Sequence, residues 1–267
     1  MRSYLSYFKL KFITGLQYRA AALAGMSTQF FFGFVYISVY IAFYESGSGT
    51  IPMDLNKLVS FLWLNQAFFA LVFMWYKDKE ILTMIKNGNV AYELCRPQDL
   101  YWMWFSKIFG ERLANVSLRF LPVLLVAYFM PGLYHLELQI SFIRLLVFTI
   151  SFVLSAVLMV CLVLLYHILC LITLDEKGIV NIFMITSDIL SGLVLPIPFF
   201  PLWLQNISNF LPFRYISDFP FRFYVGDIAM NEGLISILVQ IIWIIILIFV
   251  GKLITNKALK RAVIQGG

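Results

Sequence analysis

Long runs of apolar residues are the feature that most constrains how this chain folds. One run, from Ala21 to Tyr44, contains no charged residue. A helix needs about 20 apolar residues to cross the hydrocarbon layer of a membrane, whereas the apolar core of a cleaved signal peptide has about 7–15. The composition agrees, because 61% of the residues are hydrophobic and only 13% are charged. We therefore expect a membrane protein.

Six such runs predict an all-α membrane domain that occupies residues 1–267. No stretch after residue 20 is long and polar enough to form a separate water-soluble core. The predicted spans are residues 21–44, 58–75, 113–130, 142–174, 179–195 and 234–250.

The distribution of positive charge predicts the orientation of these spans. With six spans, the segments on the N-terminal side hold 16 of the 20 lysines and arginines, and the opposite side holds only Lys57, Arg144, Arg214 and Arg222. Positively charged loops are retained in the cytosol. Both termini are therefore predicted to be cytosolic.

Two cytosolic segments are predicted to form helices that do not cross the membrane. Residues 1–20 place apolar residues on one stripe and polar residues on the other side, which predicts an interfacial helix. It either anchors the chain at the membrane surface or also contacts a cytosolic partner. The apolar stripe is Leu5, Phe8, Phe12 and Leu16, and the polar side is Ser3, Lys11 and Thr14.

The second segment, residues 77–88, has the signals of a short, self-contained helix. Asp78 suits the N-cap, Glu80 the positive end of the helix dipole, Lys86 the negative end, and Gly88 a left-handed stop. A short helix in water needs a surface to pack against. Its apolar ridge rests either on the chain's own inner ends or in a cleft of another subunit. The ridge is Ile81, Leu82 and Ile85, with Lys79 among the flanking charges. After this segment, Asp99 is the predicted N-cap of an aromatic run, residues 100–105, that suits membrane anchoring.

On the opposite side, residues 196–233 are too long for a turn and too apolar for a solvated loop. Pro201 suits the start of a short helix through Leu211, and a second helix is expected from Phe213. Irregular backbone at membrane depth must be buried or line a cavity, so we expect two partly inserted outer helices, which either gate an exit or only pack. The candidate gate residues are Pro196, Pro198, Phe199, Phe200 and Pro201.

Three ionisable residues lie well inside the predicted spans, where such groups are costly. Asp188 is in the middle of the fifth span, and pairing with Arg119 or His167, contact with a substrate, or a purely structural bond all remain open. Arg119 lies near the inner end of the third span and can snorkel to the surface. His167, in the fourth span, suits an interhelical hydrogen bond.

Several functional classes find no support in the sequence. It contains neither H-E-x-x-H nor G-x-S-x-G, so no catalytic residue is predicted. It also lacks the nucleotide-binding motif G-x-x-x-x-G-K-[ST], so any ATPase must be another chain. Cys95, Cys161 and Cys170 have no metal-site spacing. The net charge of +6 is spread over short segments rather than one patch, which argues against nucleic-acid binding.

The chain resembles the permease subunit of bacterial type-2 ABC exporters. The order of elements agrees with that family: an N-terminal amphipathic helix, six spans, a short helix after the second, and a proline-rich stretch before the last. The residues that carry the resemblance are 16–20, 29–31, 88–97 (GNVAYELCRP), 99–102, 196–201 (PIPFFP) and 211–213.

This resemblance implies a half-transporter in the bacterial inner membrane, without a cofactor of its own. Two permeases, identical or related, would pair with two cytosolic ATPase subunits that bind ATP and Mg²⁺. Residues 78–87 would be the coupling helix in the ATPase cleft, and the substrate would be amphipathic or lipid-like. The alternative is an ion-coupled secondary transporter that uses Asp188 and His167, although such proteins ordinarily show inverted repeats. A polytopic enzyme lacks a reactive constellation.

Overall fold

The computed structural model describes residues 2–47, 51–75, 77–139, 141–173 and 175–265. In these residues it is all-helical, with 82% helix and no strand. Four helices are long and apolar enough to cross a membrane, by length and composition. They are α2 (Arg19–Glu45), α7 (Leu100–Phe129), α8 (Phe142–Thr173) and α12 (Met230–Gln265), the last of these as far as Lys260. The chain is thus a multi-pass membrane protein.

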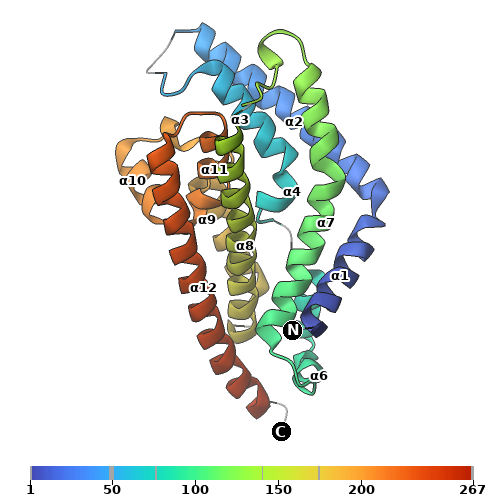
Figure 1. Ribbon diagram of the computed structural model, residues 1–267. Coiled ribbons are helices and arrows are strands. Elements are labelled where there is room, and N and C mark those ends of the chain that lie inside the picture. The colour runs from blue at the N-terminus through green and yellow to red at the C-terminus, as the bar shows by residue number, and fades with distance from the viewer. Residues whose placement is uncertain (1, 48–50, 76, 140, 174, 266–267) are drawn as a thin grey trace.

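These long helices form an elongated bundle whose two ends differ (Figure 1). The start of α1 (Arg2–Leu16), the short α6 (Val90–Leu94) and the end of α12 lie at one end. At the other end lie the end of α2 and the short helices α10 (Leu202–Phe210) and α11 (Asp218–Tyr224). Because the start of α1 and the end of α12 lie at the same end of the bundle, the fold is compatible with an even number of crossings.

The second predicted span is a broken helix rather than a continuous one. It consists of α3 (Leu55–Ala67) and α4 (Phe69–Val72), which meet at Phe68, and the chain is extended at Phe73. Arg112 of α7 is 1% exposed, and its Nη1 donates hydrogen bonds of 2.9 Å to the carbonyl oxygens of Leu71 and Phe73. The arginine thereby satisfies backbone groups that the early end of α4 leaves without helical partners.

The fifth predicted span is also shorter than expected. Helix α9 (Glu176–Leu190) ends at Ser191, and Gly192 follows with φ of +73°. A helix of 15 residues is about 23 Å long, shorter than a hydrocarbon layer of about 30 Å. The six-span count therefore stays a prediction, whereas the four long helices are observed.

Helix α7 begins well before its predicted start at residue 113. Asp99 is its N-cap and accepts from the backbone N–H of Trp102. The aromatic run after Asp99 is the first part of this helix, not a separate surface anchor. Helix α1 packs along it, because Gly110 lets the backbone of Phe8 approach and Gly15 lies against Ala114.

Residues 196–233, which we call the outer segment after their predicted side, form η2 (Ile197–Phe199), α10, η3 (Pro212–Ile216) and α11. Pro201 is the N-cap of α10, near the predicted helix start, and the second helical segment begins at Pro212 as η3. Most of α10 is exposed, whereas every residue of α11 except Arg222 is buried. Whether this segment enters a membrane stays a prediction, but η3 and α11 are part of the protein core.

Candidate functional sites

The first candidate site is α5 (Lys79–Lys86), the helix predicted to contact an ATPase. Its N-cap is Asp78, whose carboxylate accepts from the backbone N–H of Ile81, and Gly88 has a φ of +71° just past its end. The cap, the charges at the two ends and the left-handed stop all agree with the sequence. An isolated helix of eight residues is unstable in water, so its stability comes from its contacts.

The apolar ridge of α5 faces the chain's own bundle. Ile81, Leu82 and Ile85 are 0%, 6% and 6% exposed, and α5 packs against α8. In the isolated chain these three side chains are thus covered by the protein itself, which agrees with the first interpretation of the ridge. Docking of α5 in a cleft of another subunit stays a prediction. The exposed residues around α5 are Lys79, Glu80, Thr83, Lys86, Asn87 and Gly88.

An ion-pair network joins α5 to α1 and α7. The Lys107 ammonium lies 2.8 Å from Asp78 Oδ1 and 2.6 Å from Glu80 Oε2, and its side chain is only 2% exposed. Lys11 of α1 donates to the same Glu80 oxygen at 2.9 Å and lies 3.6 Å from Glu111. We call Lys11, Asp78, Glu80, Lys107 and Glu111 the inner network. It ties three helices together at one end of the bundle.

The inner network changes the protonation behaviour of its exposed carboxylate. Burial raises the pKa of Glu80, but hydrogen bonds and charge attraction from Lys107 and Lys11 outweigh burial and lower this pKa to about 2. For Lys11, burial lowers the pKa, whereas the hydrogen bond to Glu80 raises it, and the net direction is upward. Both groups therefore stay charged at neutral pH.

The position of Lys11 corrects the prediction for the N-terminal helix. Lys11 was expected on the polar side and Leu5 in the apolar stripe, but Lys11 points into the bundle and Leu5 is 67% exposed. The other three residues of the predicted apolar stripe, Phe8, Phe12 and Leu16, are half-buried. Ion pairs to α5 and α7 outweigh the preference of a lysine for solvent.

The second candidate site is an apolar groove between α2, the broken α3–α4 and α9. Its volume is about 470 Å³, within the range of small-molecule sites. Asp188 of α9 lies in it and accepts a hydrogen bond from the indole N–H of Trp75. The groove is lined by Thr28, Gln29, Phe32, Tyr36, Gln66, Phe69, Phe73, Trp75, Asp188, Leu193 and Val194.

The three ionisable residues predicted inside spans do not form one cluster. Asp188 binds Trp75, whereas Arg119 Nη2 lies 3.4 Å from the carbonyl oxygen of Ala21. His167 is 0% exposed, and its Nδ1 lies 2.8 Å from the carbonyl oxygen of Val163 in its own helix. Of the three, Asp188 alone lines the groove.

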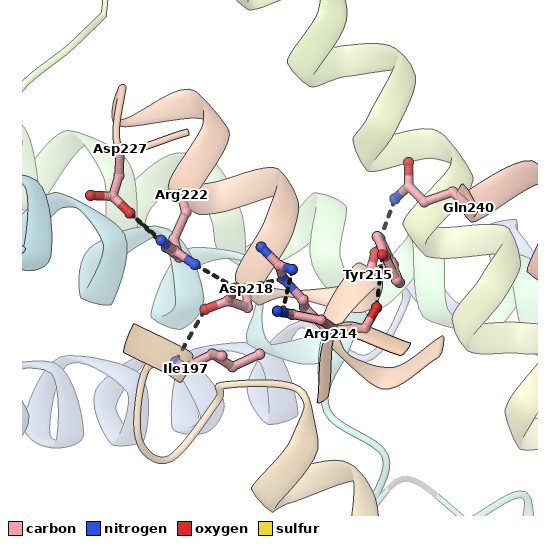
Figure 2. Close-up of polar contacts among 8 residues, drawn as sticks. Ile197, Arg214, Tyr215, Asp218, Arg222, Asp227 and Gln240 are labelled. Atoms are coloured by element: carbon pink, nitrogen blue, oxygen red, sulfur yellow. Dashed lines mark hydrogen bonds and ion pairs between the residues drawn. The ribbon is translucent and has the colours of Figure 1, made fainter. Parts of the chain in front are cut away.

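A third polar cluster fixes the outer segment and was not foreseen from the sequence (Figure 2). Asp218 is fully buried; its carboxylate lies 3.3 Å from Arg214 Nε, from Arg222 Nη1 and from the backbone nitrogen of Ile197. Arg222 also donates to Asp227 at 2.7 Å. The sequence indicates this cluster only through the four-residue spacing of Asp218 from Arg214 and from Arg222, which suits ion pairs on a helix. That spacing does not indicate that Asp218 is buried.

A buried glutamine holds the same segment to the long helices. Gln240 of α12 is 0% exposed. Its amide nitrogen donates to the Tyr215 carbonyl oxygen at 3.0 Å (Figure 2) and to the Ser155 hydroxyl at 3.0 Å. Its amide oxygen accepts from the Ser151 hydroxyl. Because this amide uses both its donor and acceptor capacity, η3 is fixed to α8 and α12.

The candidate gate residues lie next to this segment. Pro196 and Phe200 are buried, and the Phe199 ring packs against Tyr40 of α2 with ring centres 5.4 Å apart. The Gln205 amide of α10 donates to the carbonyl oxygens of Pro198 and Phe200. Pro201 is exposed. These contacts place the stretch between α2 and α10, and its role as a gate stays a prediction.

Comparison with known proteins identifies a family. Searches of curated proteins and of solved structures gave no match. The family described as "ABC-2 family transporter protein" matches residues 53–266, which include α3, α5, the outer segment and α12. The match covers most of the chain and agrees with the resemblance seen in its sequence motifs. This chain therefore belongs to the ABC-2 family of transporter proteins.

Proposed function

We propose that this protein is the membrane-spanning permease of an ATP-driven exporter, powered by a separate cytosolic ATPase. Membership of the ABC-2 family supports a permease role. The observation that carries the rest of the proposal is the two-sided character of α5. Its apolar ridge is buried and its cap is held by the inner network, while its charged side remains exposed.

A helix held in this way is suited to transmit force. The contacts of Asp78, Glu80 and Lys107 tie α5 to α7, and the packing of its ridge ties it to α8. A push on the exposed side therefore moves α5 together with two long helices instead of bending it away. In this proposal, ATP-driven closure of the partner shifts the bundle between two access states.

Because the ridge of α5 is buried, we propose that its exposed side touches the ATPase. Lys79, Thr83 and Lys86 are exposed and would form the contact, whereas Ile81, Leu82 and Ile85 would support the helix from behind. A groove of about 240 Å³ beside Lys86, bordered by Glu176 and Lys177, extends this surface. Both termini would face the cytosol, and a second permease, identical or related, would complete the transporter in the bacterial inner membrane.

The test uses the double variant Lys79→Glu/Lys86→Glu. Co-purification of an ATPase with the tagged chain, and ATP-dependent transport in vesicles, should both fall by about tenfold or more, since reversed charges at an interface oppose association. Lys9→Glu is the matched control, because Lys9 is also an exposed cytosolic-side lysine but lies on α1. Normal association and transport in the double variant would contradict the proposed contact surface.

The secondary-transporter alternative gains less support from the geometry. It would need Asp188 and His167 along one proton path, but Asp188 lines the groove and His167 lies in the core against its own helix. Transport that persists in sealed vesicles without any ATPase would favour that alternative.

A further inference from the structure

The groove between α2, α3–α4 and α9 contains polar groups that lack partners. Gln29 is 3% exposed, and neither its amide nitrogen nor its amide oxygen has a hydrogen-bond partner among the residues that the structure describes. Asp188 lines the same groove. Its Oδ2 accepts from Trp75, but its Oδ1 is buried and has no hydrogen-bond partner among the described residues. Leaving buried polar groups unpaired is energetically unfavourable. Their presence points to a ligand.

The charge of the groove indicates which ligand fits. Asp188 contributes a carboxylate, and no lysine or arginine of the described residues lines the groove. An anion placed there would meet a like charge without a compensating cation, whereas a cation would pair with the free Oδ1 of Asp188 in a poorly hydrated setting. Such pairs are stronger than those in water.

The walls of the groove favour the same class of ligand. Five of its lining residues are aromatic: Phe32, Tyr36, Phe69, Phe73 and Trp75. The faces of aromatic rings attract cations, Trp most strongly, and their area suits apolar groups. A ligand with one positive charge and a bulky apolar body would use both the carboxylate and the rings.

We propose that this groove binds a monovalent cationic amphiphile, with its positive charge against Asp188 and Gln29 and its apolar body against the aromatic walls. This inference rests on the proposed transport function, since it defines the substrate class of that permease. Within the binding site, Trp75 orients the Asp188 carboxylate by holding Oδ2, which leaves Oδ1 for the ligand.

The experiment measures equilibrium binding of tetraphenylphosphonium, a lipophilic cation, to the purified chain in nanodiscs. Tetraphenylborate, of nearly the same size and shape but negative, is the matched probe. The wild-type chain should bind the cation at least about tenfold more tightly than the anion relative to empty nanodiscs. Asp188→Asn should weaken cation binding by about tenfold, since the neutral amide removes the charge that pairs with the cation.

Two further variants keep the test decisive. Glu45→Gln, which removes an exposed carboxylate at the end of α2, should leave binding unchanged. Gln29→Leu replaces an unpaired amide with an apolar group of similar size, so the fold should be kept while cation binding weakens. Equal binding of the two probes by the wild type, or unchanged cation binding in both Asp188→Asn and Gln29→Leu, would overturn the inference.

This experiment is independent of the proposed function. Binding is measured without an ATPase, so the groove can bind the cation even if ATP-driven transport fails. Conversely, ATP-dependent transport by the complex together with absent cation binding would refute only the substrate class.

Discussion

The inner network allows a quantitative prediction, because its central lysine is buried while its partners differ in exposure. Lys107→Met removes the ammonium but keeps a side chain of similar length. Asp78, which is 3% exposed, is then left as a buried carboxylate without its cation. Breaking a buried ion pair by removing one partner typically costs about 3–5 kcal/mol.

The magnitude for this protein follows from the other contacts. Asp78 also accepts from the backbone N–H of Ile81, which partly compensates the remaining carboxylate. The bond to Glu80 adds little, because the Glu80 side chain is 58% exposed and solvent screens such pairs. We therefore expect Lys107→Met to lower the free energy of unfolding by about 3 kcal/mol, the lower end of that range.

A double-mutant cycle tests the physical reason. Asp78→Asn keeps a residue that caps helices well and leaves Glu80 as the partner of Lys107, so it should cost less than Lys107→Met. The double variant has no isolated buried charge and should be more stable than Lys107→Met alone. Reversible unfolding in mixed micelles, followed by circular dichroism, gives the free energies. Strictly additive effects would refute the assignment of Lys107 and Asp78 as an energetically coupled pair.

Three further predictions concern other contacts. The pKa of Glu80 is lowered from 4.5 to about 2 in the folded protein. The ionised Glu80 carboxylate therefore contributes to stability above pH 4.5, and this contribution is lost as the pH falls towards 2. Glu80→Gln should flatten that part of the pH–stability curve. Gly110→Val should detach α1 from α7, because a Cβ there would lie 2.8 Å from the Phe8 carbonyl oxygen, and increased proteolysis of α1 would reveal this. Gln240→Leu should lower stability by about 1–3 kcal/mol, since it leaves the buried Tyr215 carbonyl with fewer donors, and unchanged thermal unfolding would contradict this role.

Local signals in the sequence were sufficient for the bounds of α5. The cap at Asp78 and the left-handed Gly88 act within one or two turns, so the sequence contains all the residues involved. The surface that covers Ile81 and Ile85 was not predictable in the same way, because a pattern shows which side of a helix is apolar but not which element packs there. The structure supplies that element, α8.

The early end of the second span depends on a residue distant in the sequence. Residues 58–75 form an apolar run without proline or glycine, so local rules predict a continuous helix. Arg112 lies about 40 residues later, and its hydrogen bonds to the carbonyl oxygens of Leu71 and Phe73 make the early end of α4 possible. A backbone group at membrane depth needs such a partner, but no short-range pattern reveals that Arg112 supplies it.

The two predicted spans that the structure breaks or shortens, α3–α4 and α9, both border the groove. A continuous helix through residues 58–75 would hydrogen-bond its own backbone and place Phe73 and Trp75 on a regular helical surface. Because α4 ends at Val72, the non-helical chain after it brings both aromatic residues to the groove, where Trp75 binds Asp188 of the shortened α9. Natural sequences depart from local rules mainly where function requires it. Loss of helical regularity at this place is therefore a reason, independent of charge, to assign ligand binding to the groove.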